Sequence, residues 1–226
     1  MINSKKILII GGTGDIGKAI SKKYPPEDSH IVGSKDIDLS SNKSIEDFFI
    51  NNKNRYEQFI FASGVNNPAP IKGSSFDNFN NTMQVNCSSV HFIFSKNYKC
   101  FKNLRSFVVI GSLYGTIARK NRAAYTSSKH ALYGLVKSLA IELSPKCNVN
   151  MVSPGFIRTK LTIKNNTNTK LNKIVSMIPQ KKIGAPTDIA NAVYFLTDKK
   201  SKYINGVNLF VDGGFSTGGF QNYIDE

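Results

Sequence analysis

Residues 6–17 read Lys-Ile-Leu-Ile-Ile-Gly-Gly-Thr-Gly-Asp-Ile-Gly. An apolar run of strand length ends in closely spaced glycines, and a segment with helical spacing, Ile16–Tyr24, follows directly. Glycines let the backbone turn sharply and approach a pyrophosphate, while a helix N-terminus offers unpaired N–H groups and a partial positive charge. An ordinary strand-to-helix turn can look the same, but the position after an N-terminal strand favours nucleotide binding.

The rest of the chain alternates in the same way. Apolar runs of strand length are Lys6–Ile10, His30–Val32, Gln58–Ala62, Ser106–Ile110, Val149–Val152 and Val207–Val211. Helical spacing is seen in Ile16–Tyr24, Ile45–Asn51, Phe76–Phe101, Ala123–Leu143 and Thr187–Leu196. Strands rich in Ile, Val and Phe without polar alternation indicate burial on both faces. The predicted fold is α/β, a Rossmann-type doubly wound parallel sheet, in a single domain over residues 1–226.

One connection is unusually short. Only residues 33–39 separate the run His30–Val32 from the helical segment near Ile45. Parallel neighbouring strands normally need a crossover of about a dozen residues or more. We therefore expect the crossover helix between strands 2 and 3 to be missing, with a tight connection in its place.

Length and composition narrow the class of protein. A chain of 226 residues with 40% hydrophobic residues suits one folded domain rather than a disordered chain. The run Ile7–Ile10 is too short for a membrane span or a secretory segment. Cys87, Cys100 and Cys147 are scattered and form no Cys-x-x-Cys pair, which argues against a disulfide framework or a metal site. We expect a soluble, cytoplasmic protein with free, buried thiols and no membrane association.

The charge is strongly positive. The chain has 30 Lys and Arg against 15 Asp and Glu, a formal net charge of +15. Nucleic-acid binding would need these charges clustered on one face or in a known module. They are instead spread from Lys5 to Lys202, so a generally basic surface is the simpler interpretation. A non-catalytic nucleotide- or RNA-binding protein remains an alternative from another functional class.

Tyr125 and Lys129 form the candidate catalytic pair. They stand four residues apart within Ala123–Leu143, hence on one face of a helix. A nearby cation stabilises phenolate and lowers the pKa of a tyrosine from about 10, which makes the hydroxyl an acid or base near neutrality. Such a pair alone is common. Here Ser112 follows the strand Ser106–Ile110, 13 residues before the tyrosine.

With these residues the chain resembles the short-chain dehydrogenase/reductase family of NAD(P)-dependent oxidoreductases. The resemblance covers nearly the whole chain. Further matching stretches are Ala62-Ser63-Gly64, Val85-Asn86, Ser153-Pro154-Gly155, Asn205-Gly206 and Asp212-Gly213-Gly214. Within the family the chain is most similar to the 3-oxoacyl-(acyl-carrier-protein) reductase type, through Met151–Thr159, Ile183–Pro186, Asp188–Asn191 and Val211–Gly214.

The resemblance implies a role for four catalytic residues. Tyr125 would give a proton to a carbonyl oxygen as hydride arrives from the nicotinamide. Lys129 would hold the nicotinamide ribose and lower the pKa of the tyrosine. Ser112 would donate a hydrogen bond to the substrate oxygen, and Asn86 would position a water between Lys129 and solvent. The implied reaction interconverts a ketone and a secondary alcohol.

The resemblance also implies the cofactor contacts. Asp38 would meet the adenine amine, and Pro154, Gly155 and Thr159 the nicotinamide carboxamide. The full set is Gly11, Thr13, Gly14, Asp15, Ile16, Gly17, Ser34, Lys35, Asp38, Leu39, Ala62, Ser63, Gly64, Tyr125, Lys129, Pro154, Gly155, Ile157 and Thr159. The second strand ends in Ser34 and Lys35 before Asp36, and a hydroxyl or basic residue there favours the 2′-phosphate of NADP. We therefore expect NADP(H) rather than NAD(H).

The substrate is less closely defined. Residues 157–178 are expected to form a mobile substrate lid. A 3-oxoacyl thioester is the leading substrate, and a sugar or polysaccharide precursor is the alternative. The basic stretch Arg119–Arg122 is either a solvated run of charges or an attractor for an anionic substrate. A homotetramer or homodimer is implied by the resemblance, and the extension after Gly214, which ends in Gln221–Glu226, would either cover a neighbouring subunit or fray.

Overall fold

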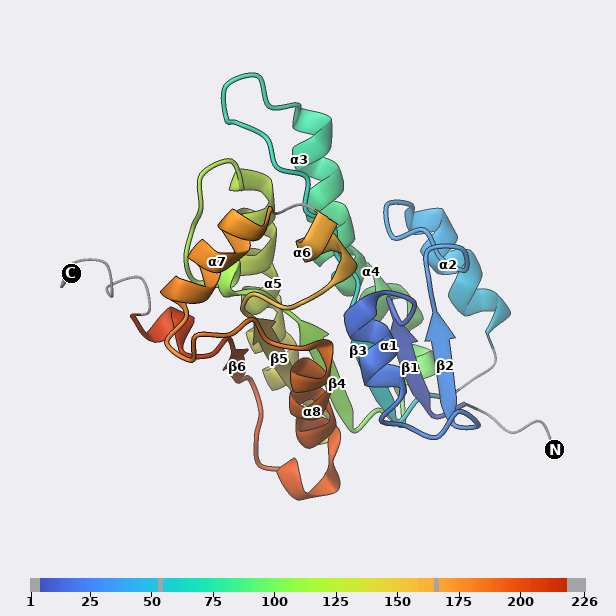
Figure 1. Cartoon of the computed structure of the whole chain (residues 1–226). Coiled ribbons are helices and arrows are strands. Elements are labelled where there is room, and N and C mark those ends of the chain that lie inside the picture. The colour runs from blue at the N-terminus through green and yellow to red at the C-terminus, as the bar shows by residue number, and fades with distance from the viewer. Residues whose placement is uncertain (1–4, 53–54, 165–166, 219–226) are drawn as a thin grey trace.

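The computed structural model describes residues 5–52, 55–164 and 167–218. These residues contain one six-stranded sheet in the order β2-β1-β3-β4-β5-β6, and every pairing is parallel (Figure 1). The strands are β1 (Ile7–Ile10), β2 (Ser29–Val32), β3 (Gln58–Phe61), β4 (Ser106–Ile110), β5 (Asn148–Pro154) and β6 (Asn208–Val211). The predicted doubly wound α/β fold is confirmed.

Helices cover both faces of the sheet (Figure 1). On one face α2 (Asn42–Asn51), α4 (Ser89–Asn97) and α5 (Ala123–Glu142) pack over strand residues such as Leu8 and Ile10. On the other face α1 (Asp15–Ser21) and α8 (Pro186–Thr197) pack over Ile7 and Ile9. Successive side chains of a strand point to opposite faces, so a strand covered on both sides must be apolar throughout.

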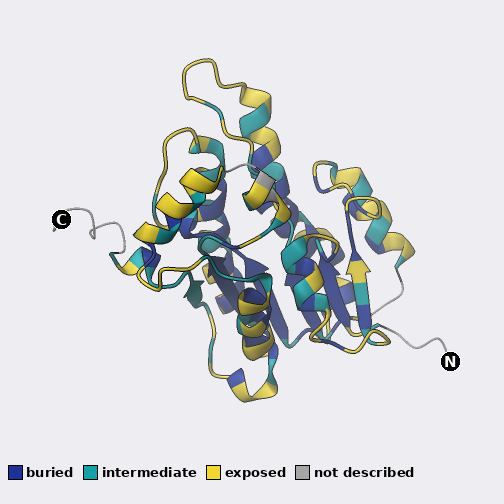
Figure 2. Cartoon of the chain, in the orientation of Figure 1, coloured by how far each residue is buried: buried dark blue, intermediate teal, exposed yellow. Residues whose placement is uncertain are grey.

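The larger core is built around aromatic rings. Phe59 on β3 is fully buried, and its ring stacks on Phe107 of β4 with centroids 4.7 Å apart and on Phe101 at 5.4 Å. In Figure 2 the strands of the sheet are mostly buried, while the outer helix surfaces are exposed. Aromatic rings of this size remove a large apolar area from water, so this cluster is a main source of stability.

The connection after β2 is short before the next helix begins. Helix α2 is the helical segment predicted near Ile45, and the interval in which a crossover helix was expected to be missing contains none. Residues 33–41 form turns and no strand, and β2 is an edge strand of the described sheet. Because β3 pairs with β1 rather than with β2, the chain uses α2 to make the long crossover that parallel pairing requires.

The long helical segment predicted over Phe76–Phe101 is broken into pieces. It comprises α3 (Phe76–Met83), a π-helical turn (Gln84–Ser88), α4 and a 3₁₀ turn (Tyr98–Phe101). Within residues 157–178, where a lid was expected, lie α6 (Lys160–Lys164) and α7 (Asn168–Met177). Further 3₁₀ turns are Leu113–Gly115, Lys199–Ser201 and Phe215–Thr217. Residues Gln221–Glu226, expected to cover a partner or fray, lie outside the described part of the chain.

The described residues bear on three features: the cysteines, groups that could bind a metal ion, and helices that could cross a membrane. All three cysteines are free and buried, as predicted. No group of three or more His, Cys, Asp or Glu residues that could hold a metal ion occurs in the described part of the chain. None of the helices in these ranges has the length and apolar character needed to cross a membrane.

Replacing Phe59 by Ala tests the aromatic core. We expect a loss of about 3–5 kcal/mol in the free energy of unfolding, because the site cannot collapse around the missing ring. Urea unfolding of Phe59→Ala measures this loss. Ile71 is 81% exposed, so Ile71→Ala is the control and should stay within about 0.5 kcal/mol of wild type. A small effect of Phe59→Ala would contradict the description of the core.

Candidate active site

The carboxyl ends of the strands gather the predicted site residues at one edge of the sheet. Backbone hydrogen bonds join the loops there: Gly11 N donates to Val32 O at 2.8 Å, and Ala62 N donates to Ile10 O at 2.8 Å. Farther along the sheet, where β4 ends beside β5, Gly111 N donates to Val152 O at 2.8 Å. Ligands of open α/β sheets bind at this edge.

The glycine loop after β1 fits a dinucleotide. Gly11 has φ of +84°, and a Cβ there would lie 2.6 Å from backbone atoms of Ala62 and Ser63, so only glycine allows the loops to approach this closely. Helix α1 begins at Asp15, and its first N–H groups have no intrahelical partner. The Asp15 carboxylate accepts a hydrogen bond from Lys160 N at 2.6 Å. It therefore binds the segment after β5 and leaves the N–H groups to a phosphate.

Asn86 lies in the π-helical turn and is fully buried. Its amide nitrogen donates to Val65 O and to Ser128 Oγ, both at 2.9 Å, and its Oδ1 accepts from Val65 N at 2.8 Å. The π turn shifts the helix register, and such turns recur at functional sites. Asn86 therefore holds the loop after β3 against helix α5.

Lys129 is buried beside Asn86. Its Nζ donates to Ile110 O at the end of β4, at 3.0 Å. Burial lowers the pKa of this ammonium from 10.5 to about 8, because the charged form loses its hydration. The Nζ lies 5.7 Å from the centroid of the Tyr125 ring.

Tyr125 and Ser112 are hydrogen-bonded through their side chains. Ser112 Oγ also accepts from Tyr114 N at 3.2 Å, which holds the serine at the end of β4. Burial raises the pKa of Tyr125, and the bond to Ser112 is the larger of the effects that lower it. The expected lowering of the pKa of Tyr125 by Lys129 is therefore not what this structure shows. The ammonium faces the ring and bonds to a carbonyl rather than to the phenol.

Space remains open beside the side chains of Asn86 and Lys129. A Cβ added at Gly64 would lie 3.3 Å from Asn86 Oδ1 and 3.4 Å from Lys129 Nζ, so a side chain there would fill the approach to both. The residues present thus fit a nicotinamide cofactor: the glycine loop suits its phosphates, and Gly64 leaves room next to the lysine. The candidate catalytic residues Asn86, Ser112, Tyr125 and Lys129 converge at this point.

Comparison with known proteins identifies the family. A family model described as Enoyl-(Acyl carrier protein) reductase matches residues 17–216. The chain belongs to the short-chain dehydrogenase/reductase family.

Relatives within this family cover nearly the whole chain. The 3-oxoacyl-[acyl-carrier-protein] reductase of Buchnera aphidicola subsp. Schizaphis graminum is 30% identical over 94% of the chain and 98% of that enzyme. The solved structure of 4-hydroxyisoleucine dehydrogenase complexed with NADH is 28% identical, with a TM-score of 0.86 over 95% of the chain and 100% of that protein. The ligand-free aldohexose dehydrogenase of Thermoplasma acidophilum is 25% identical, with a TM-score of 0.84 over 96% of the chain and 95% of that protein.

The residues of this short-chain dehydrogenase/reductase that were predicted to meet the adenosine end of the cofactor lie in the turns after β2. Ser34 and Lys35 are exposed, and Asp38 is exposed with its carboxylate bound to Ser40 N and Oγ. These hydrogen bonds lower the pKa of Asp38. Leu39 is buried beneath.

Pro154 ends β5 and Gly155 follows it, with Gly155 N donating to Val211 O at 3.0 Å. Ile157 is buried, and Thr159 Oγ1 lies 3.0 Å from Thr162 Oγ1. These four residues therefore end or follow β5 at the carboxyl edge.

Ser128 is a site residue that sequence reasoning missed. It is fully buried, accepts from Asn86 Nδ2 and donates to Tyr125 O at 2.8 Å. It stands three residues after Tyr125 and directly before Lys129, and this helical spacing is the signal that could have marked it.

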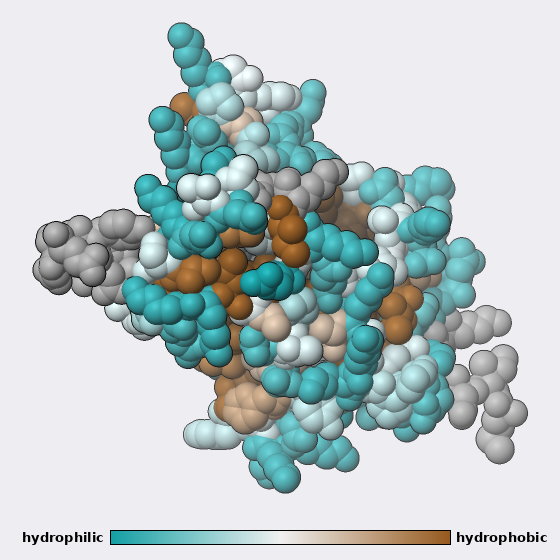
Figure 3. All heavy atoms as spheres, in the orientation of Figure 1, coloured by the Kyte–Doolittle hydropathy of each residue, from teal (hydrophilic) through white to brown (hydrophobic). Residues whose placement is uncertain are grey.

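An apolar wall lines the other side of the site. Its buried members are Leu113, Ile174, Ile178 and Phe215, with Tyr114, Phe156, Met177 and Ile183 packed against them. The rings of Phe156 and Phe215 meet edge-on at 5.3 Å. In Figure 3 hydrophobic side chains gather just below α7, within a mainly hydrophilic surface.

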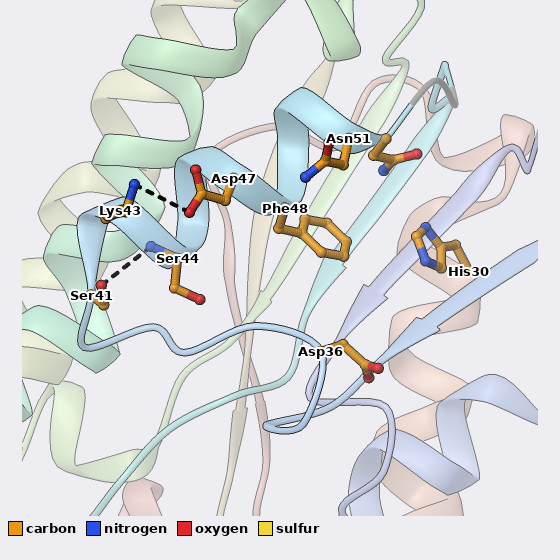
Figure 4. Close-up of a pocket in the computed structure, with 9 residues that line it drawn as sticks. His30, Asp36, Ser41, Lys43, Ser44, Asp47, Phe48 and Asn51 are labelled. Atoms are coloured by element: carbon orange, nitrogen blue, oxygen red, sulfur yellow. Dashed lines mark hydrogen bonds and ion pairs between the residues drawn. The ribbon is translucent and has the colours of Figure 1, made fainter.

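A separate cavity of about 650 Å³ opens between β2 and α2 (Figure 4). His30 from the strand and Phe48 from the helix face each other, with ring centroids 5.6 Å apart, and Asp36 lies at its rim. None of the predicted catalytic or cofactor residues lines it. The cavity lies where the edge strand has no further neighbour, away from the reacting groups.

The buried ammonium of Lys129 predicts a pH-dependent stability. Its folded-state pKa of about 8 is below 10.5, so the folded protein carries the full cost of the charge below about pH 8. As pH rises from 8 to 10.5 the folded state releases this proton first, and stability gains up to about 3 kcal/mol. Urea unfolding of wild type and Lys129→Met across this range isolates the effect. A stability difference that does not change with pH would contradict it.

Proposed function

We propose that this enzyme interconverts a ketone and a secondary alcohol with Tyr125 as general acid and base. The observation that carries the proposal is the hydrogen-bonded pair of Tyr125 and Ser112 at the carboxyl edge, with Lys129 and Asn86 buried behind it. A protein that only bound nucleotides would have no need of this arrangement.

Each side chain has a distinct task. The bound nicotinamide cofactor supplies or accepts hydride. Ser112 and Tyr125 donate hydrogen bonds to the carbonyl oxygen, which stabilises the negative charge that develops there. Burial keeps the pKa of Tyr125 high, so the phenol holds its proton at neutral pH and gives it to the oxygen in the direction of reduction.

Lys129 and Asn86 position the other groups. The Lys129 ammonium donates to Ile110 O and keeps its remaining N–H groups for the ribose of the cofactor. Asn86 uses both side-chain atoms on Val65 and also binds Ser128, so it orients the loop and the helix that meet at the site.

A 3-oxoacyl compound is the substrate that the surroundings favour, with a thioester as the form suggested by the reductase relatives. The apolar wall suits an acyl chain better than a hydroxylated sugar. It includes α7 residues Ile174 and Met177, from the segment expected to close over the substrate.

NADP(H) is the cofactor we propose. Ser34 and Lys35 are exposed after β2, where a 2′-phosphate would lie. Asp36, the carboxylate that could instead select a 2′-hydroxyl, accepts a hydrogen bond from Gly33 N at 2.8 Å and closes its own turn.

Replacing Tyr125 by Phe removes the acid and keeps the ring. We expect kcat for reduction of a 3-oxobutanoyl thioester to fall by about 10²–10⁴-fold, with the dissociation constant for NADPH changed by less than about threefold. Steady-state kinetics and fluorescence titration measure the two. Tyr133→Phe, on the same helix, is the matched control. Substantial turnover by Tyr125→Phe would refute the acid role.

If the wild type reduced no ketone yet bound RNA with a steep salt dependence, the binding-protein alternative would replace the proposal.

The cofactor proposal has its own test. We expect kcat/KM with NADPH to exceed that with NADH by about tenfold or more, and Lys35→Ala to remove most of this preference by weakening NADPH alone. Lys43→Ala, an exposed lysine on α2, serves as the control. A clear preference for NADH in the wild type would overturn the proposal.

A further inference from the structure

Two arginines lie beside the reacting phenol. Residues 116–122 lead from the 3₁₀ turn after β4 into helix α5, and Arg122 is the N-cap residue of that helix. Arg119 Nη1 donates to the Tyr114 hydroxyl at 3.2 Å. The Tyr114 ring in turn meets Tyr125 edge-on, with centroids 6.2 Å apart at 77°. The tyrosine pair thus connects the basic segment to the catalytic group.

Arg122 is the arginine closer to the chemistry. Its guanidinium interacts electrostatically with both Tyr125 and Tyr114. Arg122 stands three residues before Tyr125 in the sequence. Its Nε is buried and has no hydrogen-bond partner within the part of the chain that the structure describes. Among the described residues, Arg122 makes no ion pair with an acidic side chain.

The guanidinium of Arg122 has a donor atom that the described residues leave unused. Partial burial lowers the pKa of Arg122 and repulsion by Arg119 lowers it further, while Tyr114 and Tyr125 act in the opposite direction. Withdrawing a charge or a donor from water without a partner is costly. A carboxylate relieves this cost best, because the planar guanidinium can bind both of its oxygens in parallel.

We propose that Arg122 binds a carboxylate, so that the enzyme acts on a free 3-oxo acid and on the corresponding 3-hydroxy acid in addition to a 3-oxoacyl thioester. The reacting carbon lies at Tyr125, the carboxylate lies at Arg122, and the remaining chain lies against the apolar wall that Tyr114 joins. This inference rests on the ketone chemistry proposed for Tyr125 and adds a charged substrate to it. The phosphate of a carrier arm is too distant from the reacting ketone to satisfy Arg122, and a thioester oxygen carries no charge.

A matched pair of substrates tests the inference. Arg122→Gln should lower kcat/KM for 3-oxobutanoate by about 100-fold, chiefly through KM, while kcat/KM for its neutral methyl ester changes by less than about threefold. Arg122→Lys should keep part of the rate with the acid, because it keeps the charge and loses the fork. The control is Lys120→Gln, which removes an exposed cation from the same segment and should change neither substrate by more than about twofold.

Each contrary result has a definite meaning. Equal losses for acid and ester would show a structural role for Arg122 and overturn the inference, as would an unchanged rate with the acid. A larger loss with a 3-oxobutanoyl coenzyme A thioester than with the acid would assign Arg122 to a carrier instead and also overturn it. If the wild type reduces no ketone, the proposed function fails separately. Calorimetric titration of 3-oxobutanoate into the NADPH complexes of wild type and Arg122→Gln then decides, and equal affinity overturns the inference.

Discussion

The hydrogen bond from the Lys129 ammonium to Ile110 O connects helix α5 to the end of β4. It places a cation inside the protein at a considerable desolvation cost, which the lowered pKa of the lysine records. One helical turn earlier the same helix presents Tyr125, and two residues beyond Ile110 the chain presents Ser112. This contact therefore helps to set the position of Tyr125 relative to Ser112.

Asn86 supports that contact from the opposite side. The π-helical turn points its amide at the loop after β3 and at Ser128 of α5, so three separate elements meet at one buried polar side chain. Buried polar networks of this kind are stable only when each member is paired. These hydrogen bonds join the loop after β3 to helix α5, while Gly64 leaves the approach to Asn86 and Lys129 open.

Charge is used in two ways in this molecule. Much of the net charge of +15 is spread over the surface, where a charge is well hydrated and makes little difference to stability. Arg122 is different, because its Nε is withdrawn from water near Tyr125 without an acidic partner in the described residues. A basic side chain therefore matters little to stability on the exposed surface, whereas at Arg122 it leaves a buried donor without a partner among the described residues.

Local patterns were sufficient to predict the α/β alternation, the glycine loop and the pairing of Tyr125 with Lys129, because burial of a strand on both faces and helical spacing are visible in consecutive residues. They gave no strand order, since strand order depends on which neighbour the chain joins and not on the residues of the turn itself. They failed for the pKa of Tyr125, which depends on where the Lys129 ammonium points and how deeply both groups are buried.

Sequence by itself determined the fold class, the family resemblance and the four residues expected to carry catalysis. Only the tertiary structure showed that Ser128 and Val65 hold Asn86, that Asp36 closes its own turn and that Arg122 has a buried Nε with no partner among the residues the structure describes. The physical reason is that residue type and spacing follow from the chain, whereas desolvation and pairing depend on groups that are distant in sequence and meet only after folding.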